Sequence, residues 1–177
     1  MKGTLKLTKL EKEDYELMLA WRNDKEINSG FYTQGRDQHN ITWEEHCEWL
    51  NGRYNWMNFV IQYTPYRIVT TGSLANRFRR VGIVSIGQMD HWCPEIGYYV
   101  GDKTLWGQGI GKEAVLEGLR WMKTQGKEHC HTTVLDSNVR SVKLLKGIGF
   151  IYLGNAREGE SWYQVNFSDI SDIFREM

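Results

Sequence analysis

Three glycines at alternate positions mark the part of the sequence that is best suited to bind a ligand. Gly107, Gly109 and Gly111 follow an apolar pattern over residues 95–100 and a polar loop, and they precede an amphipathic helical pattern. A helix N-terminus presents backbone N–H groups without intrahelical partners, and its dipole adds partial positive charge. Glycines leave these N–H groups open to an anion because they carry no side chain. The arrangement predicts a strand–loop–helix that binds phosphate.

Two common phosphate-binding motifs differ from this loop. A Walker loop requires Ser or Thr after Gly-Lys, whereas Glu113 follows Gly111 and Lys112 here. A dinucleotide fingerprint has the spacing G-x-G-x-x-G directly after its strand, whereas the spacing here is G-x-G-x-G after an intervening loop. Glycine-rich loops also occur as plain turns, so other residues must identify the ligand.

Three side chains are candidates for proton transfer near this loop. Glu95 begins the predicted strand and is the first candidate for a general base acting through water; the alternative is a surface carboxylate. His91, close to Glu95 in a predicted turn, is the second candidate. His46 lies in a predicted helix and is more typical of a structural histidine.

The cysteines and the remaining histidines give no metal-binding pattern. Cys47, Cys93 and Cys130 are odd in number and lack C-x-x-C spacing, which is typical of reduced, buried thiols in a cytoplasmic protein. His129 and His131 flank Cys130, but a zinc site would need further ligands and the sequence contains no second cluster. We therefore expect no metal.

Composition limits the classes of function. The 177 residues suffice for one domain, 1–177, and are too few for two of ordinary size. The 22 basic and 22 acidic side chains balance, so no net charge attracts nucleic acid or a membrane. No segment approaches the ~18 apolar residues of a membrane span, and the N-terminus lacks the apolar run of a signal peptide. A cytoplasmic location is the expectation.

Hydrophobic periodicity and turn residues place these motifs on predicted elements. Strands are predicted at residues 4–10, 59–63, 82–90, 95–100, 131–135, 150–153 and 162–167. Helices are predicted at 13–23, from the capping box at Thr42, from 110 to a stop at Gly126, and at 138–148. Residues 29–40 read as a loop, and residues 64–80, which carry Arg77, Arg79 and Arg80, read as either a hairpin or a flap. The order is β-α-α-β-β-β-α-β-α-β-β, which describes a mixed α/β domain.

Two segments together resemble the GNAT superfamily of N-acetyltransferases. The first is the loop Trp106-Gly-Gln-Gly-Ile-Gly111, and the second runs Asn138-Val-Arg-Ser141-Val-Lys-Leu-Leu145-Lys-Gly-Ile-Gly-Phe150. They match the family patterns Q/R-x-x-G-x-G/A and N-x-x-S-x-x-L-Y-x-x-x-G-F over at least residues 95–167. The resemblance implies one domain of the α/β (mixed α+β) class. Its central mixed, mostly antiparallel sheet would have about seven strands, four flanking helices and a V-shaped splay between the fourth and fifth strands.

The resemblance also implies a mechanism that uses acetyl-coenzyme A (acetyl-CoA). The cofactor's pantetheine arm would pair with the backbone of Tyr98 and Val100, and a backbone N–H near Tyr99 or Val100 would polarise the thioester carbonyl. Asn138 would contact the arm and Ser141 would lie near its sulfur. The pyrophosphate would lie on the loop and first helical turn: Gly107, Gln108, Gly109, Ile110, Gly111 and Lys112.

Two departures from the family patterns matter. Trp106 stands at the Gln/Arg position of the loop, so one usual side chain near the pyrophosphate is absent. Leu145 stands at the Tyr position of the later helix. In many relatives that Tyr protonates the departing thiolate, and here another acid, or none, would serve.

The acceptor is a primary amine in the favoured interpretation. The Trp-Arg22-Asn-Asp ending of the first helix, followed by Ile-Thr-x-x-x-His46, resembles acetyltransferases that act on nucleotide-linked amino sugars and on ribosomal-protein N-termini. Arg22, Phe31 and His91 are the candidate acceptor residues, and the arginines of residues 77–80 could meet phosphate. An amino sugar or its nucleotide is favoured over a peptide N-terminal or side-chain amine, and a non-catalytic CoA-binding module is the third hypothesis. The aromatic-rich C-terminal strand is compatible with a homodimer.

Overall fold

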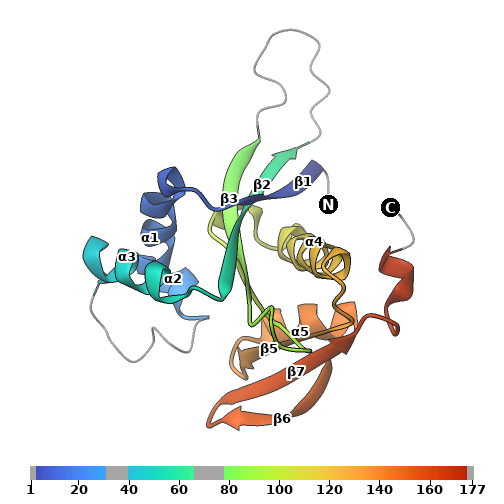
Figure 1. Cartoon of the computed structure of the whole chain (residues 1–177). Helices are drawn as coiled ribbons and strands as arrows, with labels where there is room; N and C mark the ends of the chain where they lie inside the picture. The colour runs from blue at the N-terminus through green and yellow to red at the C-terminus, as the bar shows by residue number, and fades with distance from the viewer. Residues whose placement is uncertain (1–2, 31–39, 66–77, 175–177) are drawn as a thin grey trace, which may run out of the picture.

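A seven-stranded sheet forms the centre of the protein (Figure 1). The computed structural model describes residues 3–30, 40–65 and 78–174. The strand order is β1-β2-β3-β4-β5-β7-β6, and β4 and β5 are the only parallel neighbours among the described strands. The strands are β1 (Gly3–Lys9), β2 (Trp56–Pro65), β3 (Arg79–Gly87), β4 (Glu95–Val100), β5 (His129–Leu135), β6 (Ile151–Arg157) and β7 (Glu160–Asn166). The predicted mixed, mostly antiparallel sheet is confirmed.

The described part of the chain has five α-helices, one more than expected. They are α1 (Tyr15–Asn23), α2 (Lys25–Asn28), α3 (Trp43–Gly52), α4 (Ile110–Thr124) and α5 (Val139–Ile148). The additional helix is the single turn α2, which forms because the side chain of Asp24 accepts hydrogen bonds from the backbone N–H groups of Glu26 and Ile27. The capping box predicted at Thr42 starts α3. No described helix has the length and apolarity needed to cross a membrane.

Helices cover both faces of the sheet. In Figure 1, α1, α2 and α3 gather on one side of β2 and β3, and α4 lies on the other. Successive residues of β4 point to opposite faces. Ile96 and Tyr98 therefore pack into the cluster that includes α4 and α5, whereas Tyr99 packs with Met18 of α1.

The sheet opens between β4 and β5. These two strands pair only at Glu95 and His131, next to a hydrogen bond from the His131 N–H to the Pro94 carbonyl at 3.0 Å. Beyond that point the two carboxyl ends diverge, so no strand among the described residues lies beside the edge of β4 towards Val100. This confirms the predicted splay.

A buried polar pair joins α1 to α3. Arg22 donates from Nη1 to Nδ1 of His46 over 2.7 Å, and His46 is completely buried. Burial, followed by the nearby Arg22 charge, lowers the pKa of His46 from 6.5 to about 4. His46 is therefore neutral at neutral pH, and its Nδ1 lone pair is available to accept.

This pair predicts acid sensitivity of the fold. The pKa of His46 is lower in the folded protein than in the unfolded chain, so the unfolded chain binds the proton more readily. The folded state keeps this contribution to its free energy of unfolding in full above pH 6.5. As the pH falls from 6.5 towards 4, the free energy of unfolding decreases by about 3 kcal/mol. Urea unfolding of the wild type and of His46→Asn at several pH values measures it. We expect the wild type to lose more stability than the variant between pH 6.5 and pH 4; parallel profiles would contradict the assignment.

Candidate active site

The larger of two cavities at the splay lies between β4 and the two helices α4 and α5. It has a volume of about 590 Å³, and we call it the glycine-loop cavity. Its lining combines the end of α2, the carboxyl end of β4, the glycine loop and the first turn of α5. The predicted cofactor residues in its lining are Tyr98, Val100, Gly107, Gly109, Ile110, Gly111, Lys112 and Asn138, joined by Tyr99 and Ser141.

The glycine loop places the N-terminus of α4 in this cavity. Gly107 and Gly109 have φ angles of +75° and +83°, a region that side-chain-bearing residues rarely adopt, and a Cβ at either position would meet open space. Gly109 precedes the first helical residue and has no side chain to cap the helix. The first N–H groups of α4 are therefore left for an anion.

The side chains around the loop differ in their relation to the cavity. Gln108 is exposed, its side chain donates to the Thr104 carbonyl over 2.9 Å, and it is not part of the cavity lining; its expected contact with the cofactor stays a prediction. Lys112 lines the cavity, with its Nζ 3.4 Å from the Gly147 carbonyl. Arg140 of α5, which the sequence reading missed, also lines the cavity and lies over the Trp106 ring at 5.4 Å. It brings a cation to the loop that lacks the usual Gln or Arg.

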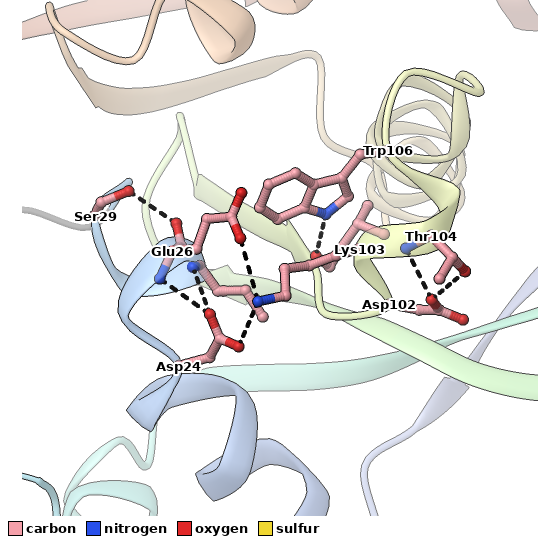
Figure 2. Close-up of polar contacts among 9 residues, drawn as sticks. Asp24, Glu26, Ser29, Asp102, Lys103, Thr104 and Trp106 are labelled. Carbon is pink, nitrogen blue, oxygen red and sulfur yellow. Dashed lines mark hydrogen bonds and ion pairs between the residues drawn. The ribbon is translucent and has the colours of Figure 1, made fainter.

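The backbone of β4 has free hydrogen-bonding groups on the open side of the splay. The Gly101 N–H donates to the Val81 carbonyl of β3, which continues the β3–β4 register. In an antiparallel ladder alternate residues face the partner strand, so Tyr99 faces β3 and Val100 faces away. The Val100 carbonyl indeed accepts from Trp106 Nε1 over 2.8 Å (Figure 2). Of the two expected carbonyl-polarising donors, the Val100 N–H is therefore the one that faces the splay, and the Tyr99 N–H is not.

An ion-pair cluster ties α2 to the loop beside this cavity. Lys103, in the short 3₁₀ helix Lys103–Leu105, lies 2.8 Å from Asp24 and 3.2 Å from Glu26. Figure 2 shows its amine between the two carboxylates, with the Trp106 indole nearby. Because Glu26 and Trp106 both line the cavity, the cluster joins two of its walls. These side chains are exposed, so the contribution to stability is small.

The second cavity also borders β4 and has a volume of about 370 Å³. We call it the Glu95 cavity. Its walls come from α1, α3, β4, β5 and the β6–β7 hairpin, and its charged residues are Arg22, Arg53, Glu95, Arg157 and Glu160. Arg157 and Glu160 pair with each other, and Glu160 is buried.

The carboxyl group of Glu95 is partly desolvated. Burial raises its pKa above the ordinary value, Glu160 adds to this shift, and the Arg53 cation opposes it. Gln88 Nε2 lies 3.4 Å from one carboxylate oxygen. A carboxyl group with a raised pKa in a cleft has the properties of a general base.

Alternating arginine and tryptophan side chains form one wall of the Glu95 cavity. Arg22 and Arg53 lie 4.0 Å and 4.5 Å from the ring centre of Trp49, and Arg53 lies 3.4 Å from that of Trp56. Burial lowers the pKa of Arg53 to about 10, so it remains charged at neutral pH. The sequence reading missed Trp49 and Arg53 as site residues; Trp49 lies one turn after His46 on α3, and Arg53 directly follows the end of this helix.

The two cavities meet at residues from β4 and the start of α5. Tyr98, Tyr99, Asn138 and Ser141 line both cavities, as does Gly30 just after α2. The hydroxyl groups of Tyr98 and Ser141 lie 3.0 Å apart. Asn138 caps α5 by accepting from the Ser141 N–H. Leu145 is buried in the core and lines neither cavity.

Some expected site residues lie elsewhere. His91 is exposed in the turn before β4, its Nδ1 bonds to the Cys93 backbone, and it lines neither cavity, so it is not part of the candidate site. Phe31 and Arg77 lie outside the described residues. Arg79 and Arg80 line neither cavity and pair with Asp102 and Asp14, so they do not support a phosphate site.

Within the described residues no group of three or more His, Cys, Asp or Glu side chains could hold a metal ion. The expectation of a metal-free site stays a prediction. Cys93 and Cys130 are buried, and burial raises the pKa of the Cys93 thiol to about 11, so it is not an activated nucleophile.

Comparison with known proteins gives relatives over most of the chain. Uncharacterized protein MJ1062 of Methanocaldococcus jannaschii is 35% identical over 153 residues, which are 86% of this chain and 29% of that protein, so the chain spans less than a third of this relative. The crystal structure of a domain from the same organism superposes with a TM-score of 0.82 at 32% identity, covering 93% of this chain and 99% of that one.

A more distant relative shares the fold. Spermidine N-acetyltransferase from Vibrio cholerae, crystallised with CoA and spermine, has a TM-score of 0.74 at 16% identity and covers 94% of this chain and 98% of that one. The family model for the acetyltransferase (GNAT) domain matches residues 4–151. The family motifs, the splayed sheet and this match lead to one conclusion: the chain belongs to the GNAT acetyltransferase family.

Proposed function

We propose that this protein is an acetyl-CoA-dependent N-acetyltransferase whose acceptor is a primary amine of a small molecule. The observation that carries the proposal is the meeting of two cavities at Tyr98 and Ser141, one built around a helix N-terminus and the other around a desolvated carboxyl group. Direct transfer between two substrates requires two sites that meet at one point.

The glycine-loop cavity fits CoA. The open N–H groups of α4 suit a pyrophosphate, and Lys112 and Arg140 add cations at the same cavity. The edge of β4 that faces the splay, with the Tyr98 backbone and the Val100 N–H, suits an extended amide chain such as pantetheine, which would pair with it as an added strand; the Val100 carbonyl already accepts from Trp106. Bound there, acetyl-CoA supplies the acetyl group as a thioester.

Residues near the junction of the two cavities could carry out the proton transfers and polarise the thioester carbonyl. Glu95 would take a proton from the acceptor amine through water, because its raised pKa favours proton uptake. The Val100 N–H, which faces the splay, would donate to the thioester carbonyl oxygen. Leu145 has no proton to give, so the hydroxyl groups of Tyr98 and Ser141, which line the junction, are the candidates for protonating the leaving thiolate.

The Glu95 cavity favours an acceptor with one amine and an oxygen-rich or anionic remainder. Arg157 and Glu160 neutralise each other, so the remaining charged groups are the cations Arg22 and Arg53 and the single carboxyl group of Glu95. The cavity therefore has an excess of positive charge. Such a cavity disfavours a polycation and suits phosphate or hydroxyl oxygens, while Trp49 and Trp56 hold the two guanidinium groups by stacking. An amino sugar, free or linked to a nucleotide, combines these features.

An amine panel tests the proposed reaction. The protein is incubated with acetyl-CoA and, separately, spermidine, an amino sugar, an amino sugar phosphate, a nucleotide-linked amino sugar, or a peptide with a free N-terminus, while thiol release is followed. We expect kcat/KM for a phosphorylated or nucleotide-linked amino sugar to exceed that for spermidine by about tenfold or more. The peptide as best acceptor would overturn the small-molecule assignment, and CoA binding without turnover on any amine would leave a non-catalytic module.

Substitution of Glu95 tests its assigned role. Glu95→Gln keeps the size and polarity of the side chain but removes the proton acceptor, so we expect kcat to fall by about 10²–10⁴-fold with CoA affinity retained. In the wild type kcat/KM should rise with pH through a Glu95 pKa above its ordinary value, and the variant should lose this limb. Gln88→Ala is the matched control, because it removes the neighbouring amide and leaves the carboxylate. Wild-type turnover in Glu95→Gln would remove Glu95 from the mechanism.

A further inference from the structure

We propose that His46 is a positioning residue of the acceptor site, where it holds the Arg22 guanidinium on the wall of the Glu95 cavity. His46 itself lines neither cavity and cannot touch a substrate. Its action runs through Arg22, which does line the Glu95 cavity. The inference rests on the proposed transfer to an acceptor bound in that cavity.

Two contacts hold the guanidinium group of Arg22: a hydrogen bond and a stacking contact. Its Nη1 donates to His46 Nδ1 over 2.7 Å, and its guanidinium lies 4.0 Å from the Trp49 ring centre. Arg22 is 9% exposed, and burial lowers its pKa without removing its charge at neutral pH. An arginine side chain has several rotatable bonds, so fixing it before the acceptor arrives removes an ordering cost from binding.

The His46 ring is itself held rigidly. It stacks on Trp49 with centroids 6.3 Å apart and planes 15° apart, and the rings of Tyr15 and Trp43 lie 6.2 Å and 6.4 Å away. Because the imidazole is neutral, Nδ1 accepts from Arg22 and the ring proton resides on Nε2. A protonated ring would have no lone pair for Arg22 and would repel it.

Arg53 provides an internal comparison. It stacks on Trp49 and Trp56, but its buried Nε has no hydrogen-bond partner among the described residues. The same cavity wall thus presents one arginine held by a buried acceptor and one held by ring stacking. A purely structural histidine in α3 would need no such connection to a residue that faces the cavity.

Two polar substitutions of His46 distinguish its role in positioning Arg22 from a role in core packing. In His46→Asn the amide oxygen, placed like Nδ1, can accept from Arg22; in His46→Gln the oxygen lies one bond further out, near the place of Nε2. Steady-state kinetics with an amino sugar phosphate are measured for both variants, together with CoA binding and thermal unfolding at pH 7. We expect KM for the acceptor within about threefold of wild type in His46→Asn and raised about tenfold in His46→Gln, with CoA affinity unchanged in both.

A second pair of variants tests the same role if His46→Asn or His46→Gln is less stable than the wild type. Arg22→Gln alone should raise KM for the acceptor, and adding His46→Gln should then raise it no further, because the partner is already gone. Equal KM values in His46→Asn, His46→Gln and wild type, or additive effects in the double variant, would overturn the positioning role. A wild-type protein that turns over no amine would overturn the proposed function itself, which is a separate outcome.

Discussion

The single point of pairing between β4 and β5 is the constraint on which the site depends. A parallel pair that continued along its whole length would close the sheet and satisfy the backbone of β4 up to Val100. Here the strands pair only at Glu95 and His131 and then diverge. The divergence leaves one backbone edge available to a ligand, and the two cavities meet at β4 beside it.

The pleat of β4 places different functional side chains on the two faces of the strand. Glu95 and Tyr99 share one face, and Tyr98 projects from the other towards the start of α5, where its hydroxyl meets Ser141. Helix α4 contributes to both the core and the glycine-loop cavity, since its apolar face supports β4 and its N-terminus forms part of the cavity wall.

The acceptor side depends on a different kind of packing. Its wall consists of cationic and aromatic side chains that stack on one another, with His46 buried behind Arg22. A guanidinium is weakly hydrated and stacks well on indole rings, so burying it beside tryptophan costs less than burying an ammonium group. The arrangement gives a wall that is positively charged and held by ring stacking.

The sequence by itself determined the elements and the family, because both depend on local pattern. Apolar periodicity located β4 and α4, the capping box located α3, and the alternate glycines marked the turn before α4, since backbone conformation at Gly107 and Gly109 depends on residue type. Only the tertiary structure decided which side chains share a cavity. Arg53 and Glu160 have no local signal of function and are brought beside Glu95 by the packing of α3 and the β6–β7 hairpin, whereas His91, close to Glu95 in sequence, is exposed and does not line the cavity. Distance along the chain does not measure distance across a cleft, because strand pairing and helix packing connect residues far apart in the sequence.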